Sequence, residues 1–110
     1  MQTIHIHIAN RIATAEPGAW IVQDNGFSQV QFTFDREWDS YSTKKAVFIW
    51  NEGDDAVAEF ITFTGDHVPM PKISGSSYVL IGVTAGDVLT STAAKLPCRA
   101  SVITAAGRTE

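Results

Sequence analysis

Residues 30–50 contain two β-strand patterns joined by a short acidic connection, and they constrain the fold more than any other part of the chain. In the first pattern apolar side chains alternate with polar ones, which places Val30, Phe32 and Phe34 on one face. Side chains on a strand repeat every two residues, so this strand has one core face and one solvent face. Residues 46–50 are apolar at every position, which is typical of a strand covered on both sides. The stretch predicts two strands that supply much of the core of a β-sheet protein.

Short apolar segments of the same kind recur along the whole chain. Turn residues separate them, and no window shows the 3.6-residue repeat of a helix. Strands at this spacing predict an all-β fold, an antiparallel β-sandwich of about seven to eight short strands. Residues 68–71 contain two prolines, so we expect an extended edge segment there. The strands are expected at residues 3–9, 20–22, 28–34, 45–50, 56–63, 77–84, 88–92 and 99–104, with 45–50 and 56–63 forming a hairpin.

Length and charge limit the class of the protein. The 110 residues predict a single domain, residues 1–110, whose residues 105–110 have the composition of the start of a linker. The net charge is −4 and no basic cluster occurs, so nucleic-acid binding is disfavoured. The apolar runs are far shorter than the roughly 20 residues that cross a bilayer, and the first residues do not resemble a signal peptide. We expect a soluble protein made in the cytoplasm, with no membrane partner.

Few residues point to catalysis. The single cysteine, Cys98, cannot form an intrachain disulfide and is interpreted as a small buried apolar side chain. No Gly-x-Ser-x-Gly motif and no phosphate-binding loop occur. Acidic residues cluster at positions 35–39 and 52–55, but neither cluster has the spacing of a calcium loop, so we interpret them as turn and connection residues. The sequence therefore predicts no catalytic residue, no cofactor and no enzyme.

His5 and His7 are two residues apart, so they project from the same face of their strand. Such a pair binds zinc when a third ligand is near, and His67 or Asp66 would have to supply it. The other interpretation is a polar pair on an outer sheet face or at a subunit contact. Because no further ligand spacing supports the pair, we expect no metal site, and a small metal-dependent enzyme is the least favoured alternative.

The three tryptophans allow two interpretations. Trp38 lies between acidic residues in the connection and is predicted to fill the core from there. Trp20 and Trp50, with Tyr41, would instead stack against sugar rings if they formed an exposed aromatic row. A carbohydrate-binding module for host recognition is therefore the alternative function.

An ordered set of motifs resembles a module of structural proteins from tailed bacteriophages and prophages. The shared pattern begins with Phe34-Asp35-x-x-Trp38-Asp39 and continues with Lys44-Lys45-Ala46-Val47-Phe48 and a hairpin. A turn with Pro69, a strand ending in Gly82-Val83 and a threonine-rich strand with a late proline, Pro97, follow in the same order. The match covers most of the chain from Val30 onward. It includes no receptor-binding part, which is either missing or lies beyond the residues given.

The resemblance implies a non-enzymatic β-sandwich at the N-terminus of virion proteins of the head fibre, capsid-decoration, tail or baseplate type. Its partners would be other capsid or tail proteins, and it would be made in the bacterial host cytoplasm and assembled into the virion. We also expect a homo-oligomer, because symmetric assembly would hide surface in a chain with only 18% charged residues. The residues expected to matter are Phe34, Trp38, Phe48 and Tyr78 in the core, Asp39 fixing the connection, and Trp50, His5 and His7 as interaction candidates.

Overall fold

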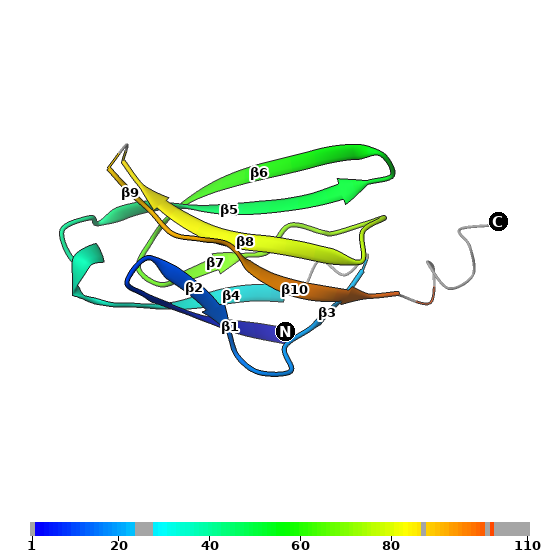
Figure 1. Ribbon diagram of the computed structural model, residues 1–110, viewed down its shortest axis with the longest axis horizontal. Coiled ribbons are helices and arrows are strands. Elements are labelled where there is room, and N and C mark those ends of the chain that lie inside the picture. Colours follow the sequence, from blue (N-terminus) through cyan, green and yellow to red (C-terminus); the bar gives the residue numbers. More distant parts are fainter. Residues whose placement is uncertain (1, 24–27, 87, 101, 103–110) are drawn as a thin grey trace.

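The computed structural model describes residues 2–23, 28–86, 88–100 and 102, and these residues form a sandwich of two β-sheets (Figure 1). The predicted all-β sandwich is confirmed, with ten strands in the described residues and one short 3₁₀ turn, η1 (Arg36–Trp38). The first sheet has the order β2 (Ile12–Ala15), β1 (Gln2–Ala9), β4 (Ser28–Phe34) and β7 (His67–Pro69). The second has the order β3 (Ile21–Val22), β10 (Ala94–Arg99), β8 (Tyr78–Ala85), β5 (Thr43–Glu52) and β6 (Asp55–Thr64), with β9 (Leu89–Thr90) also paired to β8.

Both sheets are mixed, where the sequence predicted antiparallel pairing throughout. β1 pairs in parallel with β4, and β3 pairs in parallel with β10. The first parallel pair arises because the chain leaves the β1–β2 hairpin, contributes β3 to the second sheet, and then returns beside β1. A parallel pair needs such a crossover rather than a tight turn. This path joins the two sheets near the start of the chain.

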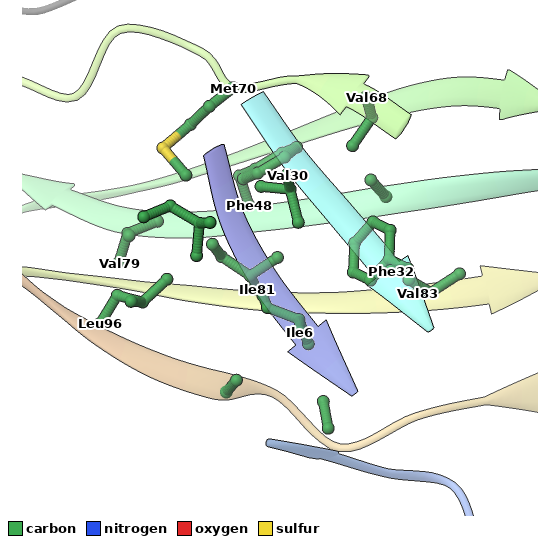
Figure 2. Close-up of a cluster of buried hydrophobic side chains, with 14 of the residues drawn as sticks. Ile6, Val30, Phe32, Phe48, Val68, Met70, Val79, Ile81, Val83 and Leu96 are labelled. Atoms are coloured by element: carbon green, nitrogen blue, oxygen red, sulfur yellow. The ribbon is translucent and has the colours of Figure 1, made fainter. Parts of the chain in front are cut away.

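The core lies between the two sheets and follows the predicted alternation. Figure 2 shows Ile6, Val30 and Phe32 of the first sheet packed toward Phe48 and Ile81 of the second. All five side chains are buried. Each fully buried side chain of this size stabilises the fold by about 1.5–3 kcal/mol relative to an exposed one, so this layer dominates the stability of the domain.

The acidic connection closes one end of the sandwich. Trp38 is only 1% exposed, and its ring lies 5.3 Å from that of Phe34, which in turn stacks on Phe32. The N–H groups of Trp38 and Asp39 donate to the carbonyl oxygens of Asp35 and Arg36, which forms the 3₁₀ turn. The indole is therefore held in the core by a tight turn, and Phe34 is a half-buried contact of this cluster.

Asp35, rather than Asp39, carries the carboxylate that fixes this connection. Asp39 is exposed, and its backbone N–H makes the turn contact. The Asp35 carboxylate accepts a hydrogen bond of 2.8 Å from the N–H of Asn10, in the turn between β1 and β2. Asn10 and Arg11 both have positive φ, and Arg11 also forms an ion pair with Glu37. The connection thus holds a turn whose backbone is unfavourable for an arginine.

Two side-chain orientations differ from the sequence prediction. β5 was expected to be covered on both sides, but within the described residues the face that carries Val47 and Ile49 is not covered by another layer. Tyr78 was expected in the core, but it lies half-buried on this same outer face, where its hydroxyl accepts a hydrogen bond from Asn51. The periodicity of a strand identifies which residues share a face, but not whether anything covers that face.

The end of the chain also differs from the prediction. The last described strand is β10 (Ala94–Arg99), five residues before the expected strand at 99–104, of which residues 101, 103 and 104 lie outside the described part. Pro97 lies inside β10. The N–H of Cys98 points to Ser77 on the β8 side, so the Pro97 nitrogen faces the other side, where β3 starts only at Ile21. The predicted linker at 105–110 lies outside the described residues.

Candidate functional site

The outer face of the six-stranded sheet is an exposed apolar surface. The strand registers place Phe60, Val47 and Gly82 in one row across β6, β5 and β8. The neighbouring row contains Ala58, Ile49 and Leu80. Phe60 is 60% exposed and Ile49 is 36% exposed, although both lie in the middle of long strands. We call Val47, Ile49, Phe60, Leu80 and Gly82 the outer apolar face.

A hollow of about 230 Å³ is sunk into this face. Its floor is the outer apolar face, and its wall is the segment 90–93, which begins at the last residue of β9. This segment is held from both sheets: the Ser91 N–H donates to the Val83 carbonyl, and the Thr92 N–H donates to the Arg11 carbonyl. The hollow is therefore a fixed feature of the backbone rather than a gap between loose side chains.

Gly82 allows this wall to approach the sheet. A Cβ atom at position 82 would lie 3.0 Å from the Thr92 carbonyl oxygen and 3.2 Å from the Ser91 hydroxyl. Both distances are shorter than ordinary contacts, and the first involves backbone that the sheet-bridging hydrogen bonds hold in place. The glycine is required by close packing here, since its backbone needs no positive φ.

The chemistry of the hollow suits apolar contact. None of its lining residues is ionisable. Its volume is below the roughly 300–1,000 Å³ typical of sites that enclose small-molecule ligands. Lys44 does not line the hollow but is buried on the inner side of β5, with its ammonium donating to the Tyr41 carbonyl at 2.7 Å and lying 4.8 Å from the Phe34 ring centroid. The outer apolar face can therefore accept apolar side chains of another protein.

The outer face of the four-stranded sheet is polar by contrast. It carries all three histidines of the chain. Register places His5, Gln31 and His67 in one row across β1, β4 and β7, and His7 lies two residues along β1 from His5. The ring of His67 is hydrogen-bonded to the adjacent Asp66 carboxylate at 2.5 Å.

This histidine-bearing face does not assemble the three-ligand metal site considered from the sequence. His5 and His67 lie on opposite sides of β4 in their row, and the His67 ring is already hydrogen-bonded to Asp66. The Glu16 carboxylate accepts a hydrogen bond from the His5 backbone. Among the described residues, no group of three or more histidine, cysteine or acidic side chains could hold a metal ion.

The aromatic row required for sugar stacking is not formed by the described residues. Trp50 is 3% exposed and belongs to the core. Trp20 is exposed, but the Arg99 guanidinium lies 4.7 Å from its ring centroid. Tyr41 is half-buried against the core. The three rings therefore offer no common platform, and Trp50 is a structural residue rather than an interaction candidate on the surface.

Cys98 also lacks the surroundings of a reactive thiol. It is buried on the inner side of β10. Burial raises the pKa of the Cys98 thiol to about 11, because the thiolate would lose its hydration. A thiol that stays protonated at neutral pH is a poor nucleophile. This side chain is a core residue, as its sequence context suggested.

Sequence reasoning missed the residues of the outer apolar face. Phe60, Leu80 and Ile49 were assigned to strands but not to a surface. One signal was present: residues 46–50 are apolar on both faces, and a domain of this size has few layers to cover both. A strand of this kind is either sandwiched between two layers or left with one apolar face for a partner.

Comparison with protein-family models, with curated proteins and with solved structures gave no match to this chain. Within the described residues, no helix has the length and apolar character needed to cross a membrane.

Proposed function

We propose that this chain is a non-enzymatic assembly domain that binds neighbouring protein subunits through its outer apolar face. The observation that carries the proposal is that β5 and β8 present apolar side chains on a face that no layer formed by the described residues covers. Exposed apolar surface of this kind, continuous across three strands, marks interaction sites in soluble proteins. The absence of ionisable residues in the hollow favours docking over catalysis.

The virion setting of the proposal rests on the sequence motif. The connection from Phe34 to Trp38 and the strand from Lys44 to Phe48 carry the resemblance to tailed-phage structural proteins. The partners would then be capsid, tail or baseplate subunits that present apolar side chains of their own. The domain would be made in the cytoplasm of the bacterial host and function in the virion.

Co-purification with the products of neighbouring genes tests this proposal. The chain is expressed with each candidate capsid or tail protein encoded beside it, and complexes are isolated by size exclusion. We expect a stoichiometric complex for the natural chain. Leu80→Lys should weaken it by at least about tenfold, because burial of a leucine contributes about 1.5–3 kcal/mol and the new cation would lie beside Lys95.

The matched control is Thr33→Lys, which introduces the same charge on the exposed outer face of the four-stranded sheet. We expect this variant to bind like the natural chain. Both variants are checked by circular dichroism and thermal melting, so that loss of fold is separated from loss of binding. Equal binding by Leu80→Lys and the natural chain would contradict the assignment of this surface.

A further inference from the structure

The edges of the two sheets differ greatly in how well they are protected. The four-stranded sheet ends in β2, with four residues, and in β7, with three residues including Pro69. The six-stranded sheet ends in β3, with two residues, and in β6, with ten. Short strands and prolines are the usual protection of a sheet edge. β6 alone among these edges is long enough to accept another strand along its full length.

β6 lacks most of the common forms of edge protection, and its charged side chains are Asp55 at its start and Glu59. It pairs with β5 without interruption from Thr64 opposite Thr43 to Asp55 opposite Glu52. Its sequence, DAVAEFITFT, contains no proline, glycine or lysine. Figure 1 shows β6 as the outermost strand of its layer among the described strands. Such an edge presents free backbone N–H and C=O groups to a strand from another chain.

We propose that β6 pairs in antiparallel fashion with β6 of a second copy of this chain, about a twofold axis at Phe60. The inference rests on the proposed function, in which the six-stranded sheet contacts other subunits, and it deepens that function. It names one of those subunits as an identical chain. A twofold contact is self-complementary, since each strand supplies the same side chains to the other.

Charge and length select the register. Residues that stand opposite each other in a sheet lie on the same face. The axis must therefore pass midway between one residue and the same residue of the other copy. An axis at Glu59 would place two carboxylates directly opposite each other, which is destabilising. An axis at Ile61 would pair only residues 58–64, whereas an axis at Phe60 pairs residues 56–64 and places Glu59 opposite Ile61. Phe60 is therefore the favoured centre.

This pairing extends the outer apolar face across the dimer. The two Phe60 rings would meet at the axis, with Val47 and Gly82 of each copy continuing the same row on either side. Each ring is 60% exposed in the single chain, so apolar area remains for the contact to bury. The two hollows would then lie on one continuous surface, available to a further subunit.

The size of the contact predicts a weak dimer. Nine paired residues at about 3.4 Å each give a seam of about 31 Å. A seam of one strand pair falls at the small end of specific interfaces, below about 1,200 Å² of total buried area. We therefore expect a dissociation constant in the micromolar range, so that dimers form at high protein concentration and dissociate on dilution.

Disulfide trapping tests both the dimer and its register. The native Cys98 is buried, so a cysteine introduced on β6 is the reactive thiol. Opposite residues of an antiparallel pair have Cβ atoms about 4.5–5.5 Å apart, close to disulfide geometry. Phe60→Cys should therefore give a covalent dimer rapidly with oxidised glutathione. Ala58→Cys, on the same exposed face but four residues from its own copy across the axis, should not.

Three outcomes would overturn the proposal. Glu59→Cys cross-linking faster than Phe60→Cys would place the axis elsewhere. Equal cross-linking of Phe60→Cys and Ala58→Cys would show random collision. A natural chain that sediments as a monomer up to the highest soluble concentration, with no trapped dimer, would remove the contact altogether.

The test also separates this inference from the proposed function. Ile61→Glu places a second carboxylate opposite Glu59 of the other copy in both halves of the seam and should abolish the dimer, while binding of neighbouring gene products through Leu80 persists. Conversely, Leu80→Lys lies two strands away from the edge and should leave cross-linking through Phe60→Cys unchanged. Loss of co-purification with retained cross-linking would contradict the proposed function alone.

Discussion

The outer faces of the two sheets differ in polarity, although they belong to the same sandwich. The four-stranded sheet presents histidine, glutamine and threonine side chains, among them His5, His7 and Gln31. The six-stranded sheet presents Val47, Ile49 and Phe60. Both sheets also bury apolar side chains on their inner faces, so the difference between the outer faces is not required by the core. Apolar residues that contribute little to the core, and remain exposed to water, are the residues to examine for binding.

The largest expected difference is in the free energy of unfolding, between Phe48→Ala and Phe60→Ala. These two changes test the two sides of the same hairpin. Phe48 is fully buried, and its truncation should lower the free energy of unfolding by about 3–5 kcal/mol. Phe60 is mostly exposed, and its truncation should change that free energy by less than about 0.5 kcal/mol. Denaturant titrations at concentrations where the chain is monomeric measure both values. Similar costs would mean that Phe60 belongs to the fold rather than to a contact surface.

Gly82→Val should have a smaller effect that is specific to the six-stranded side. The new side chain would meet the Thr92 carbonyl oxygen and force the wall of the hollow away from the sheet. We expect a loss of about 1–3 kcal/mol in unfolding free energy, typical of overpacking. Thr33→Val, which adds the same residue type to the polar outer face, is the control and should be nearly neutral. An unchanged melting temperature for Gly82→Val would show that the wall is easily displaced.

The smallest expected effect is a loss of folding stability at high pH. It arises from Cys98, on the inner face of the six-stranded sheet. The pKa of Cys98 is raised from 9.0 to about 11 in the folded chain by burial. The unfolded chain therefore releases this proton first as pH rises, so the stabilisation is complete below pH 9 and is lost as pH rises toward 11. The natural chain should lose more stability over this window than Cys98→Ala, in paired denaturant titrations.

Thiol labelling provides the accompanying control. Cys98 should react with a thiol reagent only when the chain unfolds, whereas Ile49→Cys on the outer face should provide a thiol that reacts at once. Rapid labelling of Cys98 in the folded natural chain would contradict its burial on β10.

The alternation of residues 3–9 and 28–34 was sufficient to predict both strands and their inner faces. In a strand with one apolar and one polar face, only the apolar face can pack against the core. The hairpin of β5 and β6 was equally clear from two apolar segments with a short polar loop between them. Trp38 could be assigned to the core since a lone indole among acidic residues has nowhere else to pack. The apolar strands were harder: neither Ile49 nor Tyr78 indicates from sequence which side of the sheet is covered.

The last strand was predicted too late in the chain, at residues 99–104, whereas β10 runs from Ala94 to Arg99 and includes Pro97. In the sheet this proline is tolerated, since its missing N–H faces the side where β3 has not yet begun. That property depends on a neighbouring strand some 75 residues earlier in the chain, so local sequence could not provide it. The same holds for the parallel pairing of β1 and β4, which depends on the intervening excursion through the other sheet.

The sequence by itself determined that this chain is an all-β sandwich, because side-chain alternation is a local property that each strand carries alone. Only the tertiary structure decided that the face of Ile49, Phe60 and Leu80 stays open and that β6 ends its sheet. Both facts depend on how many strands the opposite layer contains and where the sheet order stops, and no strand encodes these in its own residues. The four-stranded layer can cover only one face of the six-stranded sheet, so the other is left for neighbouring subunits in the function we propose.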